Sequence, residues 1–272
     1  MFRRCAEAVR QADGLIVAAG AGMGVDSGLP DFRGTEGFWR AYPALARARI
    51  AFESIASPSA FESNPRLAWG FYGHRLALYR RTVPHQGFAM LKAVGESMPR
   101  GVFVFTSNVD GQFQRAGFAT GCMVEIHGSI HHLQCLRGCS GDIWPADDFA
   151  PDTDDENCVL LSRPPACPRC GGLARPNILM FGDWRWADPR QAAQSAALAE
   201  WLGQVRRPVI IEVGAGTAIP SVRHFGEACR GTLIRINPTE SAVPSGKGFG
   251  LHMRGLEGIR GIAQALAEGD GK

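Results

Sequence analysis

The sequence predicts an α/β protein in which helices cover both faces of a parallel β-sheet, an arrangement called doubly wound. Short runs rich in valine, isoleucine and phenylalanine alternate along the chain with longer segments of helical periodicity. Each short run is apolar on both faces, as strands buried between two layers of helices require. Two segments interrupt the alternation, and we interpret them as insertions that form a smaller domain. The length of 272 residues and the 45% of hydrophobic residues fit a globular protein.

Five strand-like runs are expected to form the sheet, at 15–20, 101–107, 123–128, 208–214 and 232–237. Helical patterns occupy four further positions, at 86–98, 187–204, 219–229 and 257–268. Because connections between parallel strands are right-handed, this order of strands and helices predicts helices on both faces of the sheet.

The N-terminal segment, MFRRCAEAVRQADG, predicts a short amphipathic helix, since Phe2, Cys5 or Ala6, and Val9 recur at helical spacing. It has neither a long apolar core nor a small-residue cleavage site, so we do not expect a secretory signal. No apolar run approaches the ~20 residues of a membrane helix. We therefore expect a cytoplasmic protein without a membrane partner.

The two insertions differ in composition. Residues 36–84 are helical in pattern and contain prolines, whereas residues 130–180 are rich in cysteine, proline and aspartate. We therefore expect a discontinuous sheet domain made of residues 1–35, 85–129 and 181–272. The helical insertion is expected at 36–84 and the cysteine-rich insertion at 130–180.

Four of the eight cysteines fall in two close pairs, Cys135 with Cys139 and Cys167 with Cys170. Two such pairs about 30 residues apart indicate a zinc ribbon, because each pair supplies two thiolates from a tight turn to one tetrahedral ion. Four thiolates leave no open position, so we expect one structural zinc. Disulfides are the alternative, which a cytoplasmic setting disfavours. Cys158 could also substitute as a ligand.

The charge pattern gives little indication of a nucleic-acid partner. The net charge is +3, the segment 142–157 is strongly acidic, and the arginines are scattered without a basic run. We interpret the charged residues as a solvated surface and do not expect nucleic acid as a partner.

A glycine-rich stretch, GLIVAAGAGMGVDSGLPDFRG (14–34), follows the first strand. The turn at Gly20, Ala21 and Gly22 would let backbone amides approach a pyrophosphate at a helix N-terminus. A dinucleotide-binding turn would have its third glycine at the position of Val25, and Pro30 ends any helix after about one turn. Asp31, Phe32 and Arg33 are therefore expected on a loop beside the phosphates, where they could cover the reactive end of a nucleotide.

Polar residues follow two other strands at the same edge of the sheet. Asn108 and Asp110 come after the run 101–107, and His127 ends the run 123–128. Open α/β sheets bind ligands at this carboxyl edge, and a histidine with a pKa near ~6.5 can accept a hydroxyl proton at neutral pH. An Asx turn or a core histidine would explain any one of them singly, but not the set.

Several motifs, in order along almost the whole chain, resemble those of the sirtuin family. They are GAGMGVDSGLPDFRG (20–34), TSNVDGQFQRAG (106–117), EIHGS (125–129), the four paired cysteines, RPNILMFGD (175–183), VGAGTAIPSV (213–222) and INP (236–238). The resemblance implies a Rossmann-like large domain and a small domain made of a helical insertion and a zinc ribbon. It also implies NAD as cofactor and an acyl-lysine protein or peptide as substrate.

The same resemblance implies roles for individual residues. His127 would be the general base, acting with Asn108 and Asp110. The cofactor would be bound by Gly20, Ala21, Gly22, Asp31, Phe32, Arg33, Ser107, Asn108, Asp110, Gly214, Gly216, Thr217 and Asn237. The peptide substrate would add as a strand to the loop that contains Ile178, Phe181 and Gly182.

The implied activity is NAD-dependent deacylation of protein lysines, with release of nicotinamide and O-acyl-ADP-ribose. Three departures from the family pattern favour an alternative, an NAD glycohydrolase or protein ADP-ribosyltransferase. Gly24 replaces a serine or threonine, Ser107 a glutamine, and Phe113 a histidine. A third possibility is a non-catalytic NAD-responsive or zinc-ribbon binding module.

Tyr72 and Arg75 stand three residues apart in AWGFYGHRLALYR (68–80), at a spacing that puts both on one helix face. The stretch resembles the segment in which desuccinylating sirtuins carry a tyrosine and an arginine. We therefore expect these residues to bind the carboxylate of a succinyl or malonyl group. The alternative is an ordinary amphipathic helix, with the tyrosine in the core and the arginine in solvent.

Overall fold

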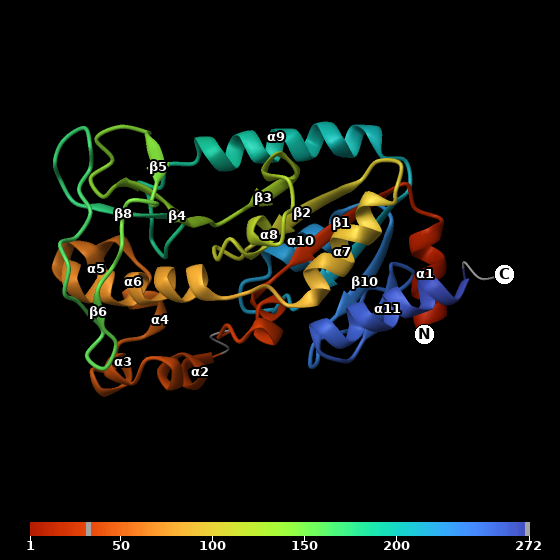
Figure 1. Ribbon diagram of the computed structural model, residues 1–272, viewed down its shortest axis with the longest axis horizontal. Coiled ribbons are helices and arrows are strands. Elements are labelled where there is room, and N and C mark those ends of the chain that lie inside the picture. Colours follow the sequence, from red (N-terminus) through yellow and green to blue (C-terminus); the bar gives the residue numbers. More distant parts are fainter. Residues whose placement is uncertain (31–33, 270–272) are drawn as a thin grey trace.

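The computed structural model describes residues 1–30 and 34–269. Figure 1 shows two parts side by side along the long axis of the molecule. One part contains a parallel sheet covered by helices and carries both termini, and the other contains helices α2 to α6 with the short strands β4 to β8. Among the described residues, no helix has the length and apolarity needed to cross a membrane.

The large part is built on a six-stranded sheet in the order β11-β10-β9-β1-β2-β3, with every neighbouring pair parallel. Its strands are β1 (Gly14–Ala19), β2 (Val102–Thr106), β3 (Met123–Glu125), β9 (Pro208–Val213), β10 (Thr232–Ile236) and β11 (Gly248–Leu251). The five strands expected from the sequence are confirmed. The edge strand β11 was not expected, because a four-residue run with two glycines carries a weak strand signal.

Helices cover both faces of this sheet, which confirms the doubly wound α/β class (Figure 1). Alternate residues of β1 serve the two faces: Leu15 and Val17 pack in one core, and Ile16 and Ala18 in the other. The first face is covered by α1 (Phe2–Arg10), α7 (Gln86–Glu96) and α11 (Gly255–Gly269), and the second by α9 (Pro189–Gln204) and α10 (Ser221–Ala228). The short helix α8 (Gln112–Arg115) follows β2.

The small part has its own hydrophobic core. Its helices are α2 (Gly34–Ala41), α3 (Pro43–Arg47), α4 (Phe52–Ile55), α5 (Pro58–Ser63) and α6 (Pro65–Arg81). Its strands are β4 (Gly128–Cys135), β5 (Ile143–Pro145) and β8 (Ala174–Ile178), which form an antiparallel sheet in the order β5-β4-β8, and the hairpin β6 (Thr153–Asp154) and β7 (Val159–Leu160). The domain bounds expected from the sequence stay a prediction.

Helix α6 joins the helical and cysteine-rich segments. It begins where the Asn64 side chain accepts a hydrogen bond from the amide of Leu67 (3.1 Å), with Pro65 in the first turn. A Cβ at Gly70 would lie 2.1 Å from the carbonyl oxygen of Cys158, so glycine is needed for this close approach. Cys158 is buried in the small core, and the structure therefore rules it out as a member of the cysteine cluster described below.

Candidate functional site

The carboxyl ends of neighbouring parallel strands carry most of the residues expected to act. The chain leaves β1 at Gly20, β2 at Ser107, β3 just before His127, β9 at Gly214 and β10 at Asn237. In a parallel sheet these ends lie along a single edge, which is where open α/β sheets bind ligands. The topology therefore brings the separate motifs of the sequence to one place.

After β1, two short 3₁₀ turns replace the long helix of an ordinary dinucleotide-binding unit, Ala21–Met23 and Val25–Ser27. The second turn ends at Gly28, whose φ of 85° lies in the left-handed region. The expectation that Pro30 prevents a longer helix is confirmed up to that point. Asp31, Phe32 and Arg33, expected on the following loop, lie outside the described residues.

The turn at Gly20 packs tightly against the turn that follows β9. The amides of Gly20 and Gly22 donate to the carbonyls of Val213 and Gly214, each at 3.0 Å. A Cβ at Gly20 would lie 2.7 Å from the Cα of Ala215, so a side chain there has no room. Main-chain carbonyls therefore occupy these two amides in this structure. The assignment of Gly20, Ala21 and Gly22 to a pyrophosphate stays a prediction.

Asn108 is held by the turn after β1. Its Nδ2 donates to the carbonyl oxygen of Gly20 (3.0 Å), and its own amide donates to Oγ1 of Thr106 (3.0 Å). Thr106 Oγ1 in turn donates to the carbonyl of Ala19 (2.9 Å). Asn108 is thus fixed by the ends of β1 and β2 together. An ordinary Asx turn does not account for its side chain, which bonds to a different strand end.

His127 lies half-buried just beyond β3. Burial lowers the pKa of its imidazole below the ordinary value, and a hydrogen bond to the main chain of Ser107 offsets only part of that shift. Because burial holds the pKa below the ordinary value, the imidazole is neutral at pH 7, and the ring nitrogen that carries no proton can accept one. His127 therefore has the ionisation state of a general base.

Glu125, two residues before His127, is a supporting residue that the sequence reasoning missed. It is buried, its carboxylate pairs with Arg190 of α9, and its amide donates to Oε1 of Gln194 (3.0 Å). These contacts tie the end of β3 to α9 and fix the direction in which the chain enters His127. A charged residue inside an otherwise apolar strand was the available signal.

Asp110 is only 8% exposed, and burial raises the pKa of its carboxyl to about 6. The nearby Glu125 charge adds to the rise, whereas the amide of Gln112 and the charge of Arg75 oppose it. The carboxylate accepts the Gln112 amide at 2.9 Å, and the main-chain oxygen of Asp110 contacts Nε2 of His131 at 3.0 Å. His131 thus supports the loop.

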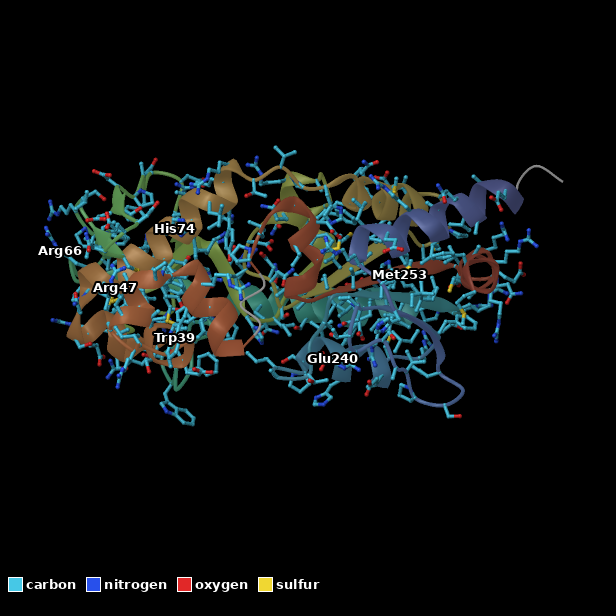
Figure 2. The ribbon with its side chains drawn as sticks, turned by 90° about the horizontal axis from the view of Figure 1, so that it is seen from below. Trp39, Arg47, Arg66, His74, Glu240 and Met253 are labelled. Atoms are coloured by element: carbon cyan, nitrogen blue, oxygen red, sulfur yellow. The ribbon has the colours of Figure 1, made fainter. Side chains whose placement is uncertain are left out.

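The residues after β9 and β10 form one hydrogen-bonded corner. Asn237 is buried and donates from Nδ2 to the carbonyl of Ala215 (2.9 Å), while its Oδ1 accepts the amide of Glu240 (3.0 Å). Thr217 Oγ1 donates to Oε1 of Glu240 (2.5 Å), and Gly216 lies beside the same carboxylate. Glu240, labelled in Figure 2, was not expected from the sequence.

The loop after β8 begins beside His127. The amide of Leu179 donates to the carbonyl of His127 (2.9 Å), and the amide of Phe181 donates to that of Ala56 (2.9 Å). Gly182 has a φ of 65°, a left-handed conformation that suits glycine. Ile178, expected to touch substrate, is buried in the small core, whereas Phe181 is partly exposed. This loop therefore connects the histidine edge to the small part.

Tyr72 and Arg75 lie on one face of α6, and both are buried. Arg75 is 7% exposed, its Nε donates to the Tyr79 hydroxyl (3.0 Å), and its guanidinium lies over the Tyr72 ring at 5.5 Å. The alternative of an arginine in solvent is therefore wrong. Since the charge of Arg75 lowers the pKa of Asp110, this cation lies within electrostatic reach of the candidate site.

The four paired cysteines form one cluster, in which all Sγ atoms lie within 4.8 Å of one another. The Sγ of Cys135 is 3.7 Å from that of Cys170, and the Sγ of Cys139 is 3.6 Å from that of Cys167. Four sulfurs bound to zinc at about 2.3 Å are about 3.8 Å apart in a tetrahedron, whereas a disulfide joins them at about 2.05 Å. The cluster fits a closed zinc site and does not fit disulfides.

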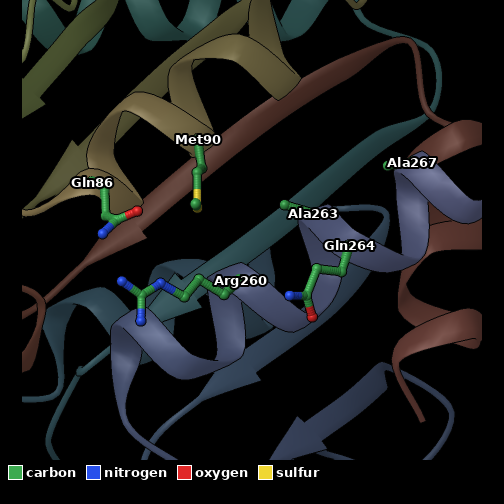
Figure 3. A pocket seen from close by; sticks show the side chains of 6 residues that line it. All are labelled: Gln86, Met90, Arg260, Ala263, Gln264 and Ala267. Atoms are coloured by element: carbon green, nitrogen blue, oxygen red, sulfur yellow. The ribbon is translucent and has the colours of Figure 1, made fainter.

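An open groove of about 600 Å³ lies elsewhere, between α7 and α11. Figure 3 shows the side chains that line it, which are Gln86, Met90, Arg260, Ala263, Gln264 and Ala267. None of them is among the candidate site residues, and we do not assign the groove to the site.

The Sir2 family model matches residues 20–202, which include the turn after β1, His127 and all four clustered cysteines. The chain belongs to the Sir2 family. Similar proteins include the NAD-dependent protein deacylase of Deinococcus radiodurans, 33% identical over 257 residues that cover 92% of this chain and 94% of that protein. The NAD-dependent protein deacylase of Methylococcus capsulatus is 31% identical over 256 residues, covering 92% of this chain and 90% of that protein.

Solved structures of Sir2 homologues share the fold. A Sir2 homologue in complex with NAD superposes with a TM-score of 0.71 at 23% identity, covering 97% of this chain and 93% of that one. A structure described for the mechanism and regulation of Sir2 enzymes gives a TM-score of 0.68 at 23% identity, with 98% of both chains covered. This likeness confirms the Rossmann-like large part and the smaller part as the fold of the Sir2 family.

Proposed function

We propose that this chain is an NAD-dependent protein lysine deacylase. One observation carries the proposal: Asn108, Asp110 and His127 lie at the same sheet edge from which the loop at Leu179 departs. Relatives that share about 30% identity over most of the chain are named NAD-dependent protein deacylases, and one structural neighbour is a complex with NAD. The compartment we propose is the cytoplasm.

The residues of the edge suit the cofactor and the chemistry. NAD, when bound, supplies the ribosyl group that accepts the acyl group as nicotinamide leaves. Asn108 and Asp110 would hold the nicotinamide side, and the corner of Gly214, Gly216, Thr217 and Asn237 the adenosine side. His127, neutral because burial lowers its pKa, would accept the proton of a ribose hydroxyl on its free ring nitrogen.

The substrate would lie against the loop that follows β8. An extended peptide that pairs with main-chain groups of this loop is held mainly through its backbone, so selectivity for neighbouring side chains is loose. Arg75 and Tyr72 would meet the far end of the acyl group, and a carboxylate there would pair with the guanidinium. We propose that succinyl-lysine peptides are used as well as acetyl-lysine peptides or better.

The zinc we assign to the four cysteines is structural. Cys135 ends β4, and Cys167 and Cys170 stand just before β8. A metal bound here would fasten together the ends of the two strands whose opposite ends carry His127 and Leu179. Four protein ligands leave no position for a substrate.

The second candidate is an NAD glycohydrolase or protein ADP-ribosyltransferase. It is favoured by Gly24, Ser107 and Phe113, which depart from the family pattern. Phe113 is buried in the sheet core between Phe88 and Phe118, where it packs against rings and brings no polar group to the edge. Phe113, which stands where the family pattern has a histidine, therefore contributes to core packing in this chain.

One experiment separates these functions and the third possibility, a non-catalytic binding module. Nicotinamide release and acyl-peptide loss are followed in the same mixture, with and without acyl-lysine peptides. A deacylase releases nicotinamide together with peptide deacylation, a hydrolase releases it without peptide, and a transferase labels protein with ADP-ribose. A binding module gives neither product.

A further inference from the structure

One residue beside the proposed peptide loop is unusually exposed for its type. Trp184 is 96% exposed, and the preceding apolar residues Leu179 and Phe181 are each 39% exposed. Tryptophan is normally buried to a large extent, because its side chain covers 150–250 Å² of mostly apolar surface. Three exposed apolar side chains thus lie within six residues, and we call them together the Trp184 surface.

Buried contacts of the neighbouring residues hold the segment that presents Trp184. The side chain of Asp183 is fully buried and forms an ion pair with buried Arg175, whose Nη2 lies 2.7 Å from Oδ1. The same Oδ1 accepts the amide of Arg185 (3.2 Å), and Arg175 also donates to the carbonyl of Ile178 (3.2 Å). The residues on either side of the indole are thus fixed by a buried charge pair.

A second set of buried side chains fixes the residues that follow. Gln134 donates to the carbonyl of Arg185 (2.8 Å) and accepts the amide of Ala187 (3.1 Å). Asn177 donates to the carbonyl of Ala187 (2.8 Å) and to Oε1 of Gln134 (2.9 Å). The indole is therefore held out in solvent by the fold itself, which is typical of a residue that packs against a partner.

The position of the surface indicates which partner. The loop starts at Leu179, whose amide is bonded to the carbonyl of His127, and Trp184 is five residues further on. Five residues span at most about 18 Å, and the left-handed Gly182 together with the bond from Met180 to Asp183 shortens that span. An extended peptide held at His127 would cover the same distance with about five residues.

The charge around Trp184 favours an apolar contact. Its neighbour Arg185 pairs with Glu62, the Nη1 and Oε1 atoms being 3.1 Å apart. The nearest cation in the sequence is thus paired with an acid from α5, and the Asp183 carboxylate on the other side of Trp184 is paired with Arg175. Both charged residues that flank the indole in the sequence are therefore balanced by an opposite charge.

We propose that Trp184 is a specificity-determining residue that packs against an apolar or aromatic side chain of the protein substrate, within about five residues of the acyl-lysine. The inference rests on the proposed deacylase function. Backbone pairing holds any sequence, so a single apolar contact beyond the lysine would give this enzyme a preference among substrate proteins that the acyl group alone does not.

Steady-state kinetics on eleven-residue acyl-lysine peptides test the proposal, with leucine, phenylalanine or serine placed in turn at each flanking position. We expect one position at which an apolar residue lowers KM about tenfold relative to serine. Trp184→Ala should remove that difference, chiefly through KM, and Trp184→Phe should keep most of it. Val83→Ala is the matched control, because Val83 is 74% exposed but lies in the connection between α6 and α7.

The other outcomes overturn the proposal. A wild-type enzyme without flanking preference, or a Trp184→Ala variant that loses kcat equally on long peptides and on acyl-lysine alone, shows that the indole does not read the substrate. A variant that changes sedimentation from dimer to monomer identifies a second copy of the chain as the occupant. If the wild type deacylates nothing, the proposed function fails, and fluorescence anisotropy of labelled peptides then tests the Trp184 preference separately.

Discussion

Asn108 donates a hydrogen bond from its side-chain Nδ2 to the carbonyl oxygen of Gly20, 3.0 Å away. The bond joins two motifs that stand 88 residues apart in the chain. Gly20 is itself bonded through its amide to Val213. Three adjacent strand ends, those of β9, β1 and β2, are therefore fixed relative to one another. A site assembled in advance loses less entropy when it binds a ligand.

His127→Ala is expected to lower deacylation by about 10²- to 10⁴-fold, because general-base catalysis contributes on that scale. NAD affinity should stay within a few-fold of the wild type, since the base acts after the cofactor is seated. Single-turnover deacylation and calorimetric titration with NAD measure the two quantities. His252→Ala is the matched control, because His252 is an exposed histidine beyond β11. Near-normal deacylation by the His127 variant would remove this residue from the mechanism.

Asp110→Asn is expected to stabilise the fold at neutral pH while it lowers activity. Burial raises the folded-state pKa of Asp110 to about 6, from the 3.8 of an ordinary aspartate side chain. Below the pKa of the unfolded state, the carboxyl is protonated in both states and does not change the free energy of unfolding. As pH rises from there towards 6, the unfolded state loses this proton first, and the free energy of unfolding falls. A pKa shift of this size lowers the free energy of unfolding at neutral pH by at most about 3 kcal/mol.

Urea unfolding of both proteins between pH 4.5 and 7.5 checks this prediction. The free energy of unfolding of the Asn variant should exceed that of the wild type by an amount that grows with pH and levels off above about pH 7. A difference that is constant across the range, or one that favours the wild type at pH 7.5, would show that the carboxylate is not destabilised by burial.

Cys167→Ser is expected to unfold the cysteine-rich part and to abolish activity. Structural zinc sites contribute about 10–16 kcal/mol of apparent binding free energy in model peptides at pH 7, which is as large as the whole free energy of unfolding of a typical domain. Metal analysis should find one zinc per chain in the wild type, and a chelator should lower its melting temperature. Cys122→Ser, which changes a cysteine outside the cluster, is the control. Fully active protein without zinc would contradict the assignment.

The sequence predicts the sheet well because its inner strands are buried on both faces, and such strands are continuous apolar runs. The runs at β1 and β9 are fully buried along their length. The edge strand β11 was missed because Gly248 and Gly250 carry no side chain to show a pattern. This segment is a strand because it pairs with β10, and the local sequence of the segment does not indicate that pairing.

The site is only partly predictable for the same reason. Strand order brings Asn108 and His127 to one edge, and motif spacing suffices to find them. The bonds that occupy the Gly20 and Gly22 amides come from β9 and its turn, almost 200 residues later, and no local pattern indicates them. Composition rules would also place Trp184 inside the protein, whereas buried contacts of its neighbours hold it outside.

Arg75→Met is expected to depress the succinyl-lysine reaction about ten- to hundredfold more than the acetyl-lysine reaction. A charge-assisted hydrogen bond to a carboxylate contributes about 1.5–3 kcal/mol, and an acetyl group offers no carboxylate to lose. The relevant measurement is kcat/KM on paired peptides that differ only in the acyl group. Arg80→Met is the matched control, since Arg80 lies on the same helix and donates to the carbonyls of Phe149 and Ala146 (2.7 Å each). It should lower both reactions equally, and equal losses in the Arg75 variant would show that this arginine supports the fold alone.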